Sequence, residues 1–400
     1  MEIPINTESL ADKLTEQARD HLPNLSAHST ADISVTPIPS PLIDTTFSSA
    51  TSLSTSVLNA SIHSFSDQWF AEASNLLNPA KPIWKEGYYV HAGKWYDGWE
   101  TRRHNTAEYD WVVIKLGVVC VIEGVEVDTA FFKGNEAPEA GLDAAFVEEG
   151  KEGEVKGGQG EWIGWEEVLP KQTCGPSQRQ AWRVKGKGVE EKEVNFLKLK
   201  MYPDGGIARL RVYGRVVSPP LPVKVREGGE ERPQEDLAAA LNGGVAVARS
   251  DEHFGTKSNL LLPGRGKDMG DGWETSRSRT KGHVDWVIVK LGLKGRVIEK
   301  VVVDTKDFRG NFPRAVKVEG WSESAAKAAL GTEEEPKHDG PGWRELVKGE
   351  QKCQSDHEHV FEGDALAVQQ PPEGEVWTHV KMTIIPDGGV KRLRIFGRRA

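Results

Sequence analysis

The sequence predicts an all-β protein built from two tandem jelly-roll β-sandwich domains, and three observations support this prediction. Residues 97–101 and 271–275 are identical, and both read Asp-Gly-Trp-Glu-Thr. Short segments rich in β-branched residues and bounded by turn residues occur in both halves of the chain. Helical periodicity is rare. Many short strands with frequent turns are typical of an antiparallel sandwich and of the jelly roll.

The internal duplication extends far beyond this pentapeptide. Ser66-Asp67 corresponds to Ser250-Asp251, and the Pro-Asp-Gly-Gly segment at 203–206 recurs at 386–389. The offset changes only from 184 (250 − 66) through 174 (271 − 97) to 183 (386 − 203), so each copy is one compact unit with loop insertions. We expect four parts: a Ser/Thr/Pro-rich, partly disordered N-terminal segment (1–60), a first repeat (61–217), a linker (218–242) and a second repeat (243–400).

Two predictions concern the N-terminal segment. Residues 9–22 fit a short helix capped by Ser9. Residues 24–60 are rich in Ser, Thr and Pro with few charges, which predicts a mobile or loosely attached segment.

Inside the repeats, strand patterns dominate. Segments 112–116 and 287–291 are short and β-branched, and they predict strands buried on both faces. Apolar and basic residues alternate over 196–201 and again over 209–212, which predicts a half-buried hairpin. Its bend would lie at 203–206, because proline fixes φ at the turn entry and glycine accepts positive φ.

Composition and charge exclude several classes of protein. The net charge is −9 and basic residues are scattered among acidic ones, which argues against a nucleic-acid partner. The acidic first 22 residues fit neither a secretory signal nor a transit peptide, and no segment predicts a membrane span. Cys120, Cys174 and Cys353 form no even disulfide framework. We therefore expect a cytoplasmic protein with no membrane partner.

One loop of the first copy holds the strongest candidate for a site. Glu100, Arg102, Arg103 and His104 place a carboxylate, two guanidinium groups and an imidazole close together in sequence. Arginine binds carboxylates through paired hydrogen bonds, and a carboxylate or imidazole can transfer protons. This set suits a small anionic substrate that carries amides. The structural alternative is that the pentapeptide builds a turn and fills the core, with Glu100 paired to Arg103 at the rim.

The second copy keeps this loop in part. Arg103 recurs as Arg277, but the other positions change: Arg102 to Ser276, His104 to Ser278 and Glu108 to His283. This asymmetry favours a site assembled mainly in the first copy, or one at the interface to which each copy gives different groups. Simple drift explains it almost as well.

Further polar residues carry weaker signals. Asp128 and Asn135 follow a predicted strand and could line a cavity at the loop end, or they could form turn hydrogen bonds. His357 and His359 would face the same side of an extended segment as a metal pair, but no other His or Cys lies nearby in the sequence. We predict no cofactor and leave a divalent metal open.

Taken together, the motifs of both copies resemble the allantoicase (allantoate amidinohydrolase) family. They are the segments 97–105, 109–111 and 127–129, Gly134-Asn135 and the Pro-Asp-Gly-Gly turns, and they extend over about 61–400. The resemblance implies two galactose-binding-like jelly rolls and the hydrolysis of allantoate to ureidoglycolate and urea in purine degradation. The chain departs from the family in its long N-terminal segment and in Tyr96, where the family often has methionine.

The resemblance also suggests roles for the candidate residues. Arg102 and Arg103 would bind the carboxylate of allantoate, Glu100 and His104 would transfer protons, and Asn135 or Asp128 would hold a ureido group. Their counterparts in the second copy are Glu274, Arg277 and His283. Whether the protein forms a homo-oligomer stays open.

The rival hypothesis is a non-catalytic carbohydrate- or small-ligand-binding tandem module, because fold does not dictate function. Thirteen tryptophans favour it. Against it, several of them recur at matched positions beside predicted strands and look like core residues: Trp99, Trp111, Trp273 and Trp286.

Overall fold

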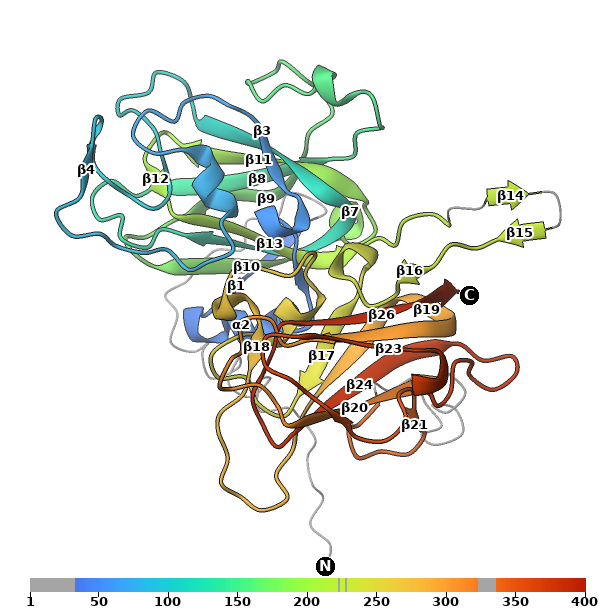
Figure 1. Cartoon of the computed structure of the whole chain (residues 1–400). Coiled ribbons are helices and arrows are strands. Elements are labelled where there is room, and N and C mark those ends of the chain that lie inside the picture. Colours follow the sequence, from blue (N-terminus) through green and yellow to red (C-terminus); the bar gives the residue numbers. More distant parts are fainter. Residues whose placement is uncertain (1–32, 222–223, 227–228, 323–335) are drawn as a thin grey trace, which may run out of the picture.

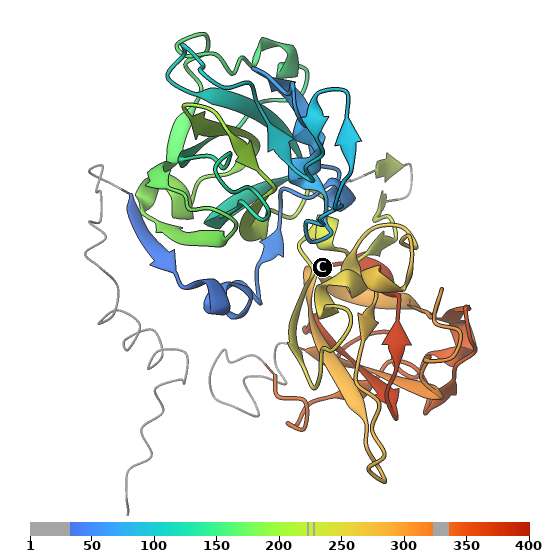
Figure 2. The same cartoon turned by 90° about the vertical axis from the view of Figure 1, so that its left-hand side faces the viewer.

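The computed structural model describes residues 33–221, 224–226, 229–322 and 336–400 (Figure 1). The helix expected at 9–22 lies outside these ranges. The two repeats form two separate antiparallel β-sandwiches, the first (blue to green) above the second (yellow to red) in both views (Figures 1 and 2). The predicted all-β tandem architecture is therefore confirmed.

One long strand, β7 (Asp110–Asp128), passes through both sheets of the first repeat. Two strands flank its first half, β3 (Ser61–Phe65) and β11 (Val194–Tyr202), and two flank its second half, β10 (Arg179–Lys185) and β13 (Arg209–Val216). Further strands widen the two sheets: β8 (Glu139–Ala145) and β9 (Glu166–Thr173) next to β11, β1 (Ser34–Ile38) next to β10, and β2 (Thr51–Ser52) next to β13. The β7 strand thus ties the two layers of the sandwich together.

The second repeat reproduces this plan around β19 (Asp285–Asp304). Its partners are β17 (Val245–Arg249) and β24 (Trp377–Ile385) on the first half, and β23 (Glu358–Glu362) and β26 (Arg392–Arg399) on the second. The sheets are completed by β20 (Ala315–Ser322), β21 (Arg344–Glu345), β22 (Gln351–Lys352) and β16 (Glu235–Asp236).

Short elements connect these sheets. The helices are α2 (Ile43–Thr46), α3 (Lys187–Glu190) and the 3-10 turns η1 (Ser40–Leu42), η2 (Ser56–Leu58), η3 (Ala73–Leu77), η4 (Glu152–Glu154), η5 (Ala240–Asn242), η6 (Lys257–Leu261), η7 (Met269–Asp271) and η8 (Gly363–Ala365). Small two-stranded ladders are formed by β4 (Tyr89–Val90) with β5 (Gly93–Lys94), β6 (Trp99–Glu100) with β12 (Gly206–Ile207), β14 (Lys224–Arg226) with β15 (Gly229–Glu231), and β18 (Trp273–Glu274) with β25 (Gly389–Val390).

The buried strands were predicted correctly. Val112, Val113 and Ile114 are all fully buried, because one face of β7 packs into the sandwich core and the other is covered by a loop that includes Val147 and Val155. Burial on both faces is what a continuous β-branched run predicts.

The predicted hairpin is wrong. β11 pairs with β7 and β8, whereas β13 pairs with β7 and β2, so the bend at 203–206 carries the chain from one sheet to the other. Nor is β11 half-exposed: Lys198 and Lys200 are buried, and both bind Asp143 on β8 at 2.9 and 2.6 Å. Paired lysines can occupy positions that an alternating pattern assigns to solvent.

Residues 33–60 also differ from the expectation of a loosely attached segment. β1 and β2 pair with sheet strands, and Ile43, Leu53 and Leu58 are fully or almost fully buried. This segment is also part of the duplication. β2 and η2 lie 184 residues before β16 and η5 of the second repeat, the same offset as between Ser66 and Ser250. The structural repeats therefore begin near residues 51 and 235, earlier than the expected 61 and 243.

The two repeats are joined by specific contacts. Leu58 packs in the core cluster of the second repeat. Lys257 donates from Nζ to the carbonyl oxygen of Ser48 at 2.7 Å, and the Ser218 hydroxyl donates to the Gly292 carbonyl at 2.9 Å.

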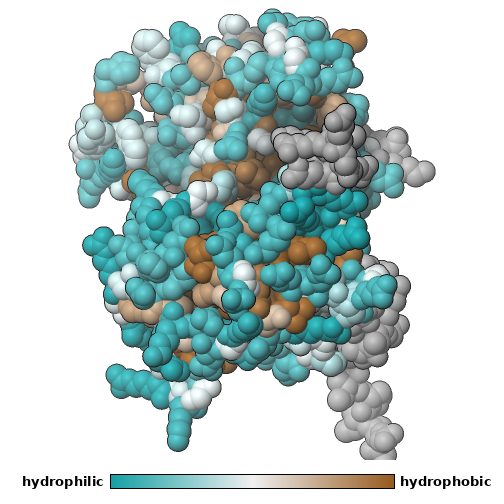
Figure 3. Space-filling view, turned by 45° about the vertical axis from the view of Figure 1, so that its right-hand side comes forward, coloured by the Kyte–Doolittle hydropathy of each residue, from teal (hydrophilic) through white to brown (hydrophobic). Residues whose placement is uncertain are grey.

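The face shown in Figure 3 is largely hydrophilic, with hydrophobic residues in small groups. Among the described residues, no helix is long and apolar enough to cross a membrane.

Candidate active site

Most residues of the repeated pentapeptide, 97–101, have a structural role. Trp99 is fully buried, and its Nε1 donates to the Asp67 carbonyl at 2.8 Å. Asp97 accepts from buried Arg209 at 2.7 Å. A Cβ at Gly98 would lie 2.8 Å from the Phe132 ring, so glycine is needed for this close approach. The structural reading of the motif therefore accounts for Asp97, Gly98 and Trp99.

Glu100 is different, because its carboxylate contacts polar groups from another loop. It stands at the end of β6 with 7% of its surface exposed. Its Oε1 accepts from Asn135 Nδ2 at 2.8 Å. Arg103 follows in the same loop, donates from Nη2 to the Gly134 carbonyl at 2.7 Å, and lies with Nη1 3.9 Å from Asp204 Oδ1. A carboxylate, an amide and a guanidinium group thus meet at one end of the sandwich.

The surroundings of Glu100 change its chemistry. Burial raises the pKa of the Glu100 carboxyl, while the Asn135 hydrogen bond and the charge of Arg103 oppose that shift. Burial also raises the pKa of Tyr96, with the negative charge of Glu100 acting in the same direction and a hydrogen bond from Asn135 opposing it. A buried carboxyl of this kind holds a proton more readily than an exposed one, as proton transfer requires.

The second repeat contains the same cluster. Asn311 Nδ2 donates to Glu274 Oε1, and Arg277 Nη2 donates to the Gly310 carbonyl at 2.5 Å. The contacts of each cluster come from within its own repeat, so the geometry gives no support to a site shared across the domain interface. The sequence showed that Glu, Arg and Asn are all retained in both copies, but not that Asn135 and Asn311, which belong to a separate loop, contact the two glutamates.

The remaining first-copy candidates lie elsewhere or point outward. Arg102 binds Asp67 through Nε and Nη2 at 3.1 and 2.9 Å and lies over the Trp69 ring, so it is engaged in a local ion pair. His104 is exposed with φ of 64°. Asp128 is buried and its Oδ1 accepts from the Ala130 backbone at 2.8 Å, a turn hydrogen bond.

The histidines of the second copy are held by local partners. His283 Nε2 lies 3.2 Å from Asp285 Oδ2, and Asp285 also accepts from the Ser250 hydroxyl at 2.7 Å. His359 uses both ring nitrogens, since Nδ1 contacts the Val303 carbonyl at 3.0 Å and Nε2 accepts from the Gln354 backbone at 2.7 Å. His359 therefore has no ring nitrogen free for the metal pair with His357 that the sequence left open as an alternative.

Sequence reasoning missed two residues of the first site, Asp204 and Tyr96. Asp204 accepts from the Asn105 backbone at 3.1 Å and so holds the loop that carries Arg103. Tyr96 stacks on Phe132 with ring centroids 4.7 Å apart. Asp204 belongs to the repeated Pro-Asp-Gly-Gly turn and could have been found from that repetition, whereas the second copy has Gly270 in place of Tyr96.

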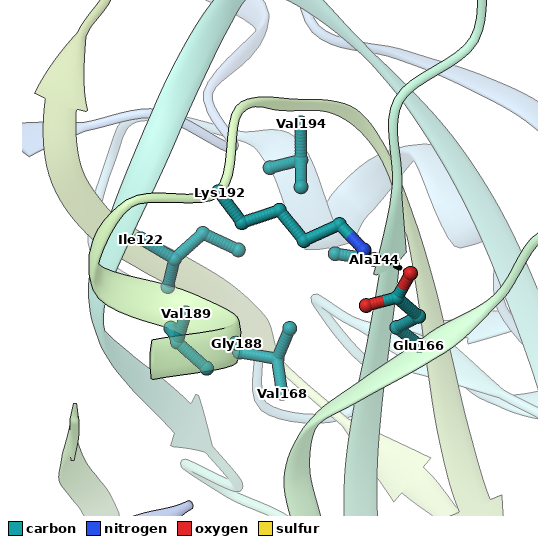
Figure 4. A pocket seen from close by; sticks show the side chains of 8 residues that line it. All are labelled: Ile122, Ala144, Glu166, Val168, Gly188, Val189, Lys192 and Val194. Atoms are coloured by element: carbon teal, nitrogen blue, oxygen red, sulfur yellow. Dashed lines mark ion pairs between the residues drawn. The ribbon is translucent and has the colours of Figure 1, made fainter. Parts of the chain in front are cut away.

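A separate small hollow in the first repeat is not a ligand site. It lies between α3, β8 and β9, holds about 10 Å³, and is crossed by the ion pair between Lys192 and Glu166 (Figure 4). Its other lining residues are mostly aliphatic, among them Val168 and Val189. Such a volume is about that of one water, so we regard it as a packing gap.

Comparisons with known proteins agree with this architecture. The allantoicase repeat family matches residues 51–217 and 235–400. The chain is 51% identical to an allantoicase of Neurospora crassa over 362 residues, which covers 90% of this chain and 94% of that protein. It is 44% identical to a probable allantoicase of Pseudomonas paraeruginosa over 343 residues, covering 85% and 93%.

A solved structure of Saccharomyces cerevisiae allantoicase matches with a TM-score of 0.71 and 43% identity, covering 91% of this chain and 99% of that one. The fold and the paired clusters define a tandem-repeat β-sandwich protein with two candidate sites. The chain belongs to the allantoicase family.

Proposed function

We propose that this protein hydrolyses allantoate to ureidoglycolate and urea, and that the cluster of Glu100, Arg103 and Asn135 carries the reaction. Family membership over both repeats supports the activity. The cluster supports the location, because it offers one group for each polar part of such a substrate. Guanidinium binds the carboxylate, the amide binds a ureido group, and the carboxyl transfers the proton.

The reaction requires a C–N bond to break at the carbon that carries both ureido groups. Glu100 in its protonated form gives its proton to the nitrogen of the departing ureido group, and urea leaves. The lone pair of the remaining ureido nitrogen stabilises the resulting cation. Water then adds to the same carbon and returns a proton to Glu100, so the carboxyl ends the cycle as it began.

The single observation that carries this assignment is the buried Glu100 carboxyl in contact with Asn135 and close to Arg103. Arg102 and His104 play smaller parts in the proposal. Arg102 holds the loop through Asp67, and exposed His104 could exchange protons with solvent at the mouth of the site.

The test is urea release from allantoate by the purified full-length protein, with a glyoxylate-yielding product measured in parallel. We expect both products in equal amounts, and we expect Glu100→Gln to abolish them while the protein stays folded. If neither product appears, with or without an added divalent metal, and sugars bind instead, the binding-module hypothesis is correct.

We further propose a cytoplasmic location. Cys120, Cys174 and Cys353 are all free thiols, as a reducing compartment favours. Fluorescence microscopy of the tagged protein tests this, and a signal confined to an organelle would contradict it.

A further inference from the structure

The two clusters differ most in the loop that leads to them. Between η3 and β6 the first repeat has a longer connection than the second repeat has between η6 and β18, and the difference of ten residues appears as the fall in offset from 184 to 174. We call residues 78–96 the aromatic insertion, because it carries several large rings: Trp84, Tyr88, Tyr89, Trp95 and Tyr96.

The aromatic insertion reaches the Glu100 cluster through a series of contacting rings. Trp84 lies 6.0 Å from Phe131 and 5.8 Å from Tyr96, measured between ring centroids. Tyr96 in turn stacks on buried Phe132 and lies beside Asn135. The Tyr96 ring therefore lies beside Asn135 and close to the Glu100 carboxyl, and Trp84 packs against Tyr96.

The corresponding positions of the second repeat are small or charged. Tyr96 corresponds to Gly270 and Phe131 to Asp307. Asp307 Oδ2 pairs with Lys391 Nζ at 3.1 Å, and Lys391 also pairs with Asp271. Glu274 is only half-buried, whereas Glu100 is buried. Ion pairs of Lys391 with Asp271 and Asp307 thus stand where the first repeat has aromatic rings, and the Glu274 carboxyl is more exposed to water than that of Glu100.

We infer that the aromatic insertion confines hydrolysis to the first repeat, and that the Glu274, Arg277 and Asn311 cluster of the second repeat binds the same ureido carboxylate without hydrolysing it. This inference rests on the proposed function. Recognition needs the guanidinium and amide groups, which both repeats keep in the same arrangement. Proton transfer to a poor leaving group also needs a shielded carboxyl, which the first repeat provides.

Activity measurements test where hydrolysis takes place. Glu100→Gln should reduce urea release at least 100-fold, although the second cluster is untouched. Tyr96→Gly, which installs the residue of the second repeat, should reduce kcat more than it changes KM, and Tyr96→Phe should retain most of kcat because the ring cover remains. If Glu100→Gln keeps about half of the wild-type kcat, both repeats are catalytic and the inference is wrong.

Binding stoichiometry tests the second site independently of turnover. Equilibrium dialysis with allantoate should give two molecules bound per chain of the inactive Glu100→Gln protein, since glutamine keeps an oxygen that accepts from Asn135. Adding Arg277→Gln should reduce this to one. Arg309→Gln is the matched control, because Arg309 is an exposed arginine beside Gly310 and should leave two sites.

The outcomes separate the two proposals. One site per chain that Arg277→Gln does not affect would overturn the second site while leaving hydrolysis at the first intact. Wild-type protein that releases no urea would overturn the proposed function itself, whatever the stoichiometry. Melting temperatures of all variants guard against misfolding, and a Tyr96→Gly protein that is folded and fully active would show that the aromatic insertion does not confine hydrolysis.

Discussion

The Arg103→Gln substitution should weaken substrate binding more than it weakens folding. The size of each effect can be worked out from the contacts of Arg103. The side chain is 41% exposed, makes one hydrogen bond to the Gly134 carbonyl, and lies 3.9 Å from Asp204. Losing these exposed contacts should cost about 0.5–1 kcal/mol of folding free energy. Losing a charged contact to a substrate carboxylate should cost about 1.5–3 kcal/mol, or about 10- to 150-fold in kcat/KM.

Urea release at low allantoate gives kcat/KM, and thermal unfolding gives the change in stability. Arg102→Gln is the matched comparison in the same loop, because Arg102 is held by Asp67 and should affect activity less than Arg103 does. A large drop in melting temperature for Arg103→Gln with unchanged kcat/KM would refute the reasoning and make its structural contacts its main role.

Three further predictions concern stability. Because burial raises the pKa of Glu100, the folded state holds this proton more tightly than the unfolded chain does, and the stabilisation from that proton is lost as pH rises through the raised pKa. The melting temperature of Glu100→Gln relative to wild type should therefore rise as pH increases from below the ordinary glutamate pKa of about 4.3 to neutral pH, and a constant difference would contradict this. Leu58→Ala should cost about 2–5 kcal/mol in urea denaturation because Leu58 is 1% exposed and packs in the second repeat's core, and a loss below about 1 kcal/mol would argue against that packing. Gly206→Ala should cost about 1–3 kcal/mol because its Cβ would lie 2.1 Å from a buried phenylalanine ring, whereas Gly153→Ala, with open space around its Cβ, should change little; equal effects would show that the ring contact is unimportant.

The sequence predicted the parts of the fold that depend on local pattern and on repetition. The β-branched run at 112–114 is buried on both faces, and fully buried Trp99 and Trp273 confirm two of the four predicted core tryptophans. The other two, Trp111 and Trp286, are partly buried on the outer face of the sheet. Hydrophobic residues that recur at matched positions of the two copies are kept there by packing, so the repeated pattern identifies them as core or partly buried residues.

Features that depend on long-range pairing were not predictable in this way. The turn at 203–206 has the residues of a hairpin bend, yet its two strands belong to different sheets, because both pair with the 19-residue strand β7. Likewise, the Ser- and Thr-rich residues 33–60 pack onto the first repeat because β1 pairs with β10 and β2 pairs with β13. Local composition does not show which distant edge is available.

Repetition alone could not separate site residues from scaffold residues, for a physical reason. A residue kept in both copies can serve the scaffold, as Asp97 does by pairing with Arg209, or the chemistry, as we propose for Glu100. The residues that we infer to make the two copies differ in function occur only in the first copy. There the aromatic insertion places Tyr96 against Phe132. Packing keeps the β-sandwich core the same in both copies of a duplicated domain. An added loop can change the environment of one carboxyl without disturbing that core. A division of labour between the repeats is therefore most readily encoded in the loops in which they differ.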